Sequence, residues 1–268
     1  MKTFNGKFKA IKMPEGAAAE YAKYSCNFYI GCSNECSYCF NNRWKWGNVP
    51  TLKKCFKDEE HALEVFEKEL KANLPEFQKY GLFFTFTSDP CLAETQSLNA
   101  KAILISIQNK VTVKVLTKNA SVALHSAKFG FGNYNQLYKD FVSFGFTLTG
   151  RDDLEPNAST NSERIEAMQK LHDAGFKTFA SIEPVIDFES SHRMINNTDG
   201  FCDLYKIGLE SGKKYSRVSL KMFVEWILEY ANPNAKIYFK DSLLKQAGIN
   251  RSDLPANCVD RDYNIFNP

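Results

Sequence analysis

Short runs of apolar and β-branched residues recur along the chain and alternate with segments in which apolar residues are spaced for a helix. The runs predict strands at 25–30, 82–87, 111–116, 141–148, 178–182, 204–207 and 236–239. Several runs are apolar on both faces, which is typical of strands in a parallel sheet that is covered on both sides. The pattern therefore predicts an α/β fold built from successive strand–helix units.

Two of the intervening helices carry clear signals. One begins at Thr160 and Glu163, which have the spacing of a capping box, and ends at Gly175. The other is marked by apolar positions three and four residues apart, at Phe223, Trp226, Ile227 and Tyr230. Strand–helix alternation allows a doubly wound open sheet or a barrel, and in both architectures the ligand site lies at the carboxyl ends of the strands.

The composition is that of a folded protein with one large core. Of the 268 residues, 44% are hydrophobic and 24% are charged, and no internal repeat, low-complexity tract or Pro/Gly/Ser-rich linker is present. No apolar run reaches about 18 residues and the N-terminus has no basic-then-apolar signal pattern, so we expect a cytoplasmic protein without membrane contact. The net charge of +3 is too small to indicate a nucleic-acid partner by itself.

Three of the eight cysteines lie close together, directly after the first predicted strand, in the pattern C-x3-C-x2-C. Cysteines in a reducing compartment serve metal binding or catalysis more often than disulfides. Three thiolates can hold three corners of a four-iron cluster and leave one iron without a protein ligand. The expected metal ligands are therefore Cys32, Cys36 and Cys39, around a 4Fe-4S cluster.

A structural zinc ion is the alternative that this pattern leaves open. A closed zinc site needs a fourth Cys or His and usually combines two short Cys/His hooks. No second hook is present, because the other cysteines and the four histidines are scattered singly. The spacing therefore favours an iron-sulfur cluster over zinc.

The C-x3-C-x2-C pattern with an aromatic residue, Tyr38, before the last cysteine resembles the signature of the radical SAM superfamily. Within it the chain is similar to the spore photoproduct lyase branch and to uncharacterised phage-type proteins, on the segments 87–89, 117–118, 144–147, 154–156 and 163–164. The resemblance implies that the cluster and S-adenosylmethionine (SAM) generate a 5′-deoxyadenosyl radical, which abstracts hydrogen from a substrate that the sequence does not identify. A lyase or an oxidoreductase is the expected class of enzyme.

The same resemblance implies the architecture. We expect a partial (β/α)6-type TIM barrel of the radical SAM kind in a single domain. The barrel is expected to cover residues 23–240. An N-terminal extension at 1–22 precedes it, and a C-terminal segment at 241–268 packs on it.

Carried over residue by residue, the resemblance assigns cofactor contacts to Tyr38, Ser88, Lys118 and Thr147. Lys118 would meet the SAM carboxylate, and the hydroxyls of Ser88 and Thr147 would offer hydrogen bonds. Each of these three has a plainer alternative. Ser88 has the position of a turn cap, Lys118 that of a solvated strand-end charge, and Thr147 that of an ordinary β-branched strand residue.

The chain departs from spore photoproduct lyase at the hydrogen-donor cysteine that the family carries before its Thr-Ser-Asp segment. Phe86 stands there, so repair of a thymine lesion is not expected. Cys91 lies just downstream and is the candidate catalytic hydrogen donor. Its alternative role is that of a small buried core residue.

Several features bear on substrates and partners. The segment 41–46 mixes basic and aromatic side chains, which suits a single-stranded nucleic-acid groove or a lid over the cluster. The segments 207–212 and 238–242 are candidate strand ends that face the substrate. Polar strand-end residues to test for substrate contact, with loop ion pairs as the alternative, are Asp89, Arg151, Glu155, Glu183 and Glu210.

Two readings of the function follow. The first is a radical SAM enzyme that uses SAM, an electron donor such as flavodoxin or ferredoxin, and a substrate that includes nucleic acid among its candidates. The second is a zinc-stabilised or cluster-stabilised nucleic-acid-binding protein without radical chemistry.

Overall fold

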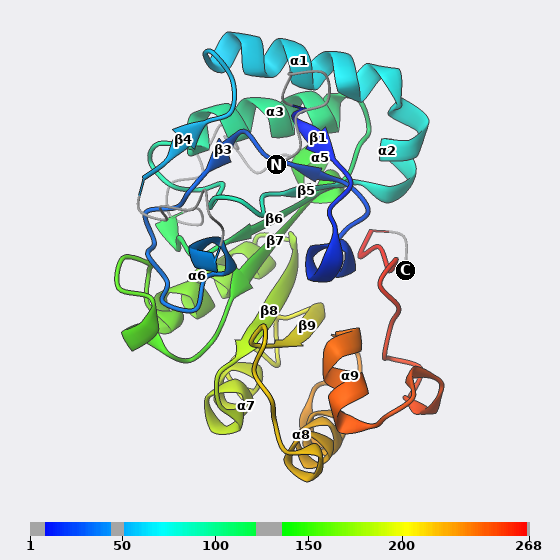
Figure 1. Cartoon of the computed structure of the whole chain (residues 1–268). Coiled ribbons are helices and arrows are strands. Elements are labelled where there is room, and N and C mark those ends of the chain that lie inside the picture. Colours follow the sequence, from blue (N-terminus) through cyan, green and yellow to red (C-terminus); the bar gives the residue numbers. More distant parts are fainter. Residues whose placement is uncertain (1–8, 44–50, 122–135, 267–268) are drawn as a thin grey trace.

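The structure is a computed structural model that describes residues 9–43, 51–121 and 136–266, arranged as Figure 1 shows. Within these residues, one large sheet has the strand order β1-β2-β5-β6-β7-β8-β9-β10, and β3 pairs with β4 in a small ladder. β1 (Ile11–Lys12) is antiparallel to β2 (Ser25–Cys26). Every later pair of neighbours in the large sheet is parallel. The predicted α/β architecture with a parallel sheet is confirmed.

The remaining strands are β3 (Tyr29–Ile30), β4 (Lys53–Lys54), β5 (Leu82–Phe84), β6 (Val113–Thr117), β7 (Val142–Thr147), β8 (Lys177–Val185), β9 (Leu204–Leu209) and β10 (Lys236–Phe239). The α-helices are α1 (Glu59–Ala72), α2 (Leu74–Tyr80), α3 (Gln96–Gln108), α5 (Gln136–Phe141), α6 (Asn161–Asp173), α7 (Phe188–Asn196), α8 (Arg217–Tyr230) and α9 (Asp241–Ala247). The 3-10 turns are η1 (Gly16–Glu20), η2 (Phe40–Arg43), η4 (Asp152–Leu154) and η5 (Arg251–Asp253).

The helix α6 forms as its sequence signals predict. The Thr160 side chain accepts a hydrogen bond from the backbone of Glu163, and the Glu163 side chain accepts one from the backbone of Thr160. The chain leaves the helix at Gly175, whose φ of 92° lies in a region that glycine reaches without a steric cost. These local signals fix both ends of the helix.

The first predicted strand, 25–30, is broken into β2 and β3. The Asn27 side-chain oxygen accepts hydrogen bonds from the backbone amides of Phe86 and Thr87, at 2.9 and 3.1 Å. A side chain therefore takes the place of the ladder at this point, and β3 pairs with β4 instead of with the large sheet. The break allows the chain that follows β3 to turn over the end of the sheet.

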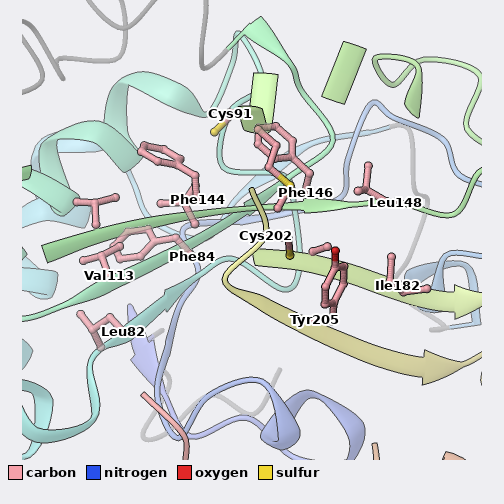
Figure 2. Packing of buried hydrophobic residues seen from close by; sticks show 14 of the residues in the cluster. Leu82, Phe84, Cys91, Val113, Phe144, Phe146, Leu148, Ile182, Cys202 and Tyr205 are labelled. Carbon is pink, nitrogen blue, oxygen red and sulfur yellow. The ribbon is translucent and has the colours of Figure 1, made fainter. Parts of the chain in front are cut away.

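The two faces of the sheet pack against different parts of the chain. One face buries Phe144, Phe146 and Ile182 against the helices, as Figure 2 shows for part of this core. The other face buries Phe83, Phe179 and Leu204 against Tyr21, near the N-terminus, and Ile265, near the C-terminus. Segments from both ends of the chain therefore cover the sheet on the face that carries the site.

No helix in the described part of the chain combines the length and the apolar character that crossing a membrane requires.

Candidate active site

A cavity of about 1170 Å³ lies at the carboxyl ends of the parallel strands. It is lined by the cysteine loop (residues 31–39), by the segments that follow β5 and β6, by the ends of β7 and β8, and by the N-terminal segment up to Tyr24. Ordinary ligand pockets have volumes of roughly 300–1,000 Å³. The cavity therefore has room for a cofactor and a second molecule.

All three cysteines of the C-x3-C-x2-C pattern line this cavity. Cys36 is buried, and Cys32 and Cys39 are half-buried. Burial raises the pKa of Cys32 to about 12 and also raises that of Cys36, so both thiols are protonated at neutral pH without a cation beside them. A metal centre supplies that positive charge, because a thiol that coordinates a metal is deprotonated.

The arrangement of the thiols distinguishes between the two metal centres that the sequence allows. The described residues contain no grouping of three or more His, Cys, Asp or Glu side chains that suits a single metal ion. Zinc draws its ligands to one centre at about 2.3 Å, whereas a four-iron cluster takes one thiolate per iron and holds the thiolates farther apart. Three thiols that face one cavity without converging on a point therefore fit the cluster.

The cysteine loop is anchored to Thr87, which follows β5. The backbone amide of Gly31 donates to the Thr87 carbonyl at 2.9 Å, and the Asn41 side chain donates to the same oxygen at 3.3 Å. Gly31 has a φ of 97°, and a Cβ there would lie 2.4 Å from the backbone oxygen of Thr51. Only glycine fits at this close approach, which sets the direction of the loop.

Asp89 joins the cysteine loop to the ends of β5 and β6. Its buried carboxylate accepts hydrogen bonds from Asn34 Nδ2 at 3.0 Å and from the amide of Lys118 at 2.8 Å. It also accepts from Thr117 Oγ1 at 2.6 Å and from the amide of Cys91 at 2.9 Å. With four protein donors satisfied, Asp89 orients Lys118 and the loop rather than a substrate.

We expect Asp89→Asn to lower the stability of the protein by about 2 kcal/mol or more, because the amide group of Asn cannot accept hydrogen bonds and leaves buried donors without partners. Urea denaturation measures this loss. The iron content after anaerobic reconstitution should also fall, since Asn34 no longer holds the loop. Asp153→Asn, at an exposed carboxylate, is the matched control and should change neither quantity. Unchanged stability and iron content in Asp89→Asn would remove Asp89 from this role.

A buried chain of hydrogen bonds holds Tyr38 from behind. The Tyr38 hydroxyl donates to Glu155, and Arg164 donates to the other oxygen of the same carboxylate. Arg164 also donates to the carbonyl of Thr147 at 2.5 Å. Glu155 and Arg164 are both fully or almost fully buried. Glu155 is therefore part of an internal ion pair, and Arg164 is a supporting residue that the sequence patterns did not single out as one.

The residues assigned to SAM from the resemblance come together in the cavity. Ser88, Lys118 and Thr147 line it beside Tyr38, and the Lys118 ammonium lies 5.5 Å from the centre of the Tyr38 ring. Burial opposes the charge on Lys118, but the nearby Cys36 and Glu155 outweigh it, so the pKa of Lys118 is raised. Lys118 is therefore a cation at neutral pH and faces the cysteines. Its contact with SAM stays a prediction.

Two other predicted residues lie away from the cavity lining. Cys91 is 3% exposed and packs in the core between the sheet and the helices, as Figure 2 shows. Burial and the neighbouring Asp89 raise the pKa of its thiol well above the usual value. Arg151 pairs with Asp153 at 2.7 Å and with Asp187 at 3.4 Å. A hydrogen-donor role for Cys91 stays a prediction that needs a path from this core position to the cavity.

The basic and aromatic segment 41–46 is described only in part. Asn41 holds Thr87, and Asn42 Nδ2 donates to the carbonyl of Cys36 at 3.2 Å. The first residues of the segment therefore fold back onto the cysteine loop. Trp44, Lys45 and Trp46 lie outside the described residues.

The far side of the cavity carries a second polar group. Glu183 and Glu210, both predicted from the sequence, line the cavity, as do Tyr21 and Lys240. Glu210 Oε2 lies 3.5 Å from Lys213 Nζ. The sequence gave no signal for Tyr21, which comes from a segment expected to lie outside the barrel. Lys240 was expected only as part of a candidate strand end.

Known proteins were compared with both the sequence and the fold. No protein-family model matches the chain. An uncharacterised protein of Methanocaldococcus jannaschii is 26% identical over 215 residues, which cover 74% of each chain.

Solved structures of two enzymes share the fold. Two structures of spore photoproduct lyase, one complexed with dinucleoside spore photoproduct, have TM-scores of 0.63 and 0.62 at 16% identity; they match 82% and 85% of this chain and 77% and 80% of theirs. SuiB of Streptococcus suis bound to its precursor peptide SuiA has a TM-score of 0.54 at 13% identity over 85% of this chain and 51% of that chain.

Spore photoproduct lyase and SuiB are both radical SAM enzymes. The chain has the fold of the radical SAM superfamily, near the spore photoproduct lyase branch, and the predicted resemblance is confirmed at the level of the fold.

Proposed function

We propose that this chain is a radical SAM enzyme in which Cys32, Cys36 and Cys39 hold a 4Fe-4S cluster. When bound, the cluster and SAM supply a 5′-deoxyadenosyl radical that removes a hydrogen atom from the substrate. The observation that carries the proposal is the meeting of these three thiols with Lys118 and Ser88 in one large cavity at the strand ends. The shared fold supports it.

The chain's own residues would bind and orient the cofactor. The Lys118 ammonium is placed for a charge-assisted hydrogen bond to the carboxylate of SAM, and its backbone is fixed by Asp89. The hydroxyls of Ser88 and Thr147 line the same side of the cavity and offer further hydrogen bonds. Tyr38, held by Glu155, packs beside the cysteines and keeps water from them.

The remaining predictions form part of this proposal. Flavodoxin or ferredoxin would deliver the electron in the cytoplasm. The barrel would cover 23–240, with the extension at 1–22 and the C-terminal segment at 241–268. Cys91 is proposed as the hydrogen donor only if its core position opens to the cavity. Of the fold neighbours, spore photoproduct lyase is complexed with a dinucleoside and SuiB with a peptide, so the fold alone does not choose the substrate.

The test is an anaerobic assay for 5′-deoxyadenosine. Protein reconstituted with iron and sulfide and supplied with dithionite and SAM should release it, because the cluster and SAM are the only requirements for cleavage. Elemental analysis should find iron and sulfide rather than zinc. One zinc per chain with no iron, or nucleic-acid binding that is indifferent to SAM and to a Ser88→Ala/Lys118→Ala double substitution, would replace the enzyme with the binding protein.

A further inference from the structure

The polar group across the cavity from the cysteine loop is a built structure. Glu183 Oε1 accepts a hydrogen bond from Lys240 Nζ at 2.8 Å, and Glu183 Oε2 accepts one from the Tyr21 hydroxyl at 2.7 Å. The Tyr21 hydroxyl also lies 2.5 Å from Ser181 Oγ. All four side chains line the cavity, and the side chain of Lys240 is 3% exposed. An ion pair this deep is costly to desolvate, and such pairs often mark functional sites.

The fold makes room for this pair. Glu183 stands on β8 and Lys240 follows β10, so the two side chains must meet across β9. The residue of β9 beneath them is Gly208, where a Cβ would lie 2.6 Å from Lys240 Cδ and 2.7 Å from Glu183 Cδ. Any other residue at 208 would push the pair apart. The contact therefore depends on a glycine that has no other need to be there, since its φ is not in the left-handed region.

This group is separate from the residues proposed to bind SAM. Those residues follow β5 and β6 and end β7, whereas Lys240 follows β10. In the sheet order, β10 is four strands from β6, which is roughly 19 Å along the sheet at about 4.8 Å per strand. The cavity continues from one group to the other and is larger than one ligand needs. A second molecule can therefore occupy the Glu183–Lys240 side.

The free hydrogen-bonding capacity of the pair defines what it can bind. A lysine ammonium has three donors, and among the described residues Glu183 is the only acceptor that the Lys240 ammonium reaches. Each Glu183 oxygen accepts one hydrogen bond and has a second lone pair. The cavity is thus offered a donor and an acceptor side by side. A phosphate or carboxylate ligand would satisfy Lys240 but would be repelled by Glu183.

Adjacent donor and acceptor groups recognise a ligand that presents the complementary pair on one edge. A trans peptide bond cannot do so, because its N–H and C=O point in opposite directions. A nucleobase can, since its edges carry donors and acceptors next to each other. Phe86 adds an aromatic surface: it lines the cavity, stacks on Phe83 at 4.3 Å between ring centres, and contacts Tyr21 at 6.0 Å. Stacking on an aromatic side chain is how proteins hold unpaired bases.

We infer that Phe86, Tyr21, Glu183 and Lys240 form a site for a nucleobase, which would be the substrate group of the proposed radical SAM enzyme. The inference rests on that proposed function for the identity of the substrate and on the geometry above for the class of ligand. The base can come from a free nucleotide or from an unpaired position in a nucleic-acid strand, and both present the same edge and the same aromatic face.

The test uses the reconstituted full chain and measures the affinity for two probes, the separate nucleoside monophosphates and six-residue single-stranded oligonucleotides. The wild type should bind at least one probe in the presence of SAM, and the arm that binds identifies the source. Glu183→Gln/Lys240→Met is the main variant, because removing both charges avoids a buried unpaired ion. It should weaken binding by about 10-fold or more, the value expected for loss of a two-point base contact.

Two further variants separate base recognition from general damage. Gly208→Ala keeps both charges but separates them, and it should also weaken base binding. Glu166→Gln/Lys170→Met removes an exposed ion pair on α6 and should change nothing. SAM affinity and 5′-deoxyadenosine release without a base should stay within about twofold of the wild type in all variants, since a 1.4 kcal/mol change would already be tenfold.

Three results would overturn the inference. They are an absence of binding of both probes to the wild type, unchanged base binding in folded Glu183→Gln/Lys240→Met, and a matching loss of SAM affinity in that variant, which would assign the pair to the adenine of SAM itself. A wild type that releases no 5′-deoxyadenosine but still binds the base through this pair would instead contradict the proposed function and leave the base site standing.

Discussion

Cys36→Ala is expected to abolish 5′-deoxyadenosine formation and the absorbance of the iron-sulfur cluster, while the protein stays folded. Cys36 is the middle ligand of the loop and is the buried one of the three. Two remaining thiols cannot hold three corners of the cluster. The fold should survive, because the loop is anchored by Thr87 and Asp89 and not by the thiol of Cys36.

Iron and sulfide analysis, the visible spectrum and the product assay measure this result, and circular dichroism checks the fold. Cys258→Ala is the matched control, because Cys258 is half-buried and far along the chain from the loop, and it should retain both cluster and activity. Cys91→Ala should also retain the cluster and release 5′-deoxyadenosine; a loss of substrate product alone would identify it as the hydrogen donor. Full activity in Cys36→Ala would contradict the cluster assignment.

Arg164→Met is expected to lower the free energy of unfolding by about 3–5 kcal/mol, the usual cost of leaving one partner of a buried ion pair without the other. Arg164 is completely buried and donates to Glu155 and to the carbonyl of Thr147. Its loss leaves a carboxylate and a carbonyl without donors behind Tyr38. Urea denaturation of the protein before cluster reconstitution measures the effect without any contribution from the metal.

The double substitution Glu155→Gln/Arg164→Met removes both charges and should recover a large part of the lost stability, since the unpaired carboxylate causes most of it. Lys170→Met, at an exposed ion pair on the same helix, serves as the control and should behave like the wild type. If Arg164→Met costs less than about 1 kcal/mol, the pair is hydrated and its role in holding Tyr38 is wrong.

These two variants test different properties of one site. Cys36 carries chemistry and contributes little to the stability of the fold, whereas Arg164 contributes stability and touches neither cofactor nor substrate. The site is therefore built in two layers, with the cysteines and Lys118 facing the cavity and Asp89, Glu155 and Arg164 fixing them from behind.

The sequence by itself determined the features that depend on local interactions. The capping box at Thr160 and the exit at Gly175 act within a few residues, so their pattern is enough to place α6. The buried strands are also visible, because a strand covered on both sides must be apolar along its length. The three cysteines are equally local, since they lie within eight residues of one another.

Only the tertiary structure decided which polar side chains meet. Asn27 interrupts a predicted strand because its side chain reaches amides about 60 residues away, and Asp89 binds donors on three different segments. Tyr21 contacts Glu183 across 162 positions, in a segment that the sequence placed outside the barrel. A buried carboxylate looks the same in the sequence whether it orients a loop, pairs with an arginine or faces a ligand. Its partners are chosen by the folding of distant segments, and no local pattern records that choice.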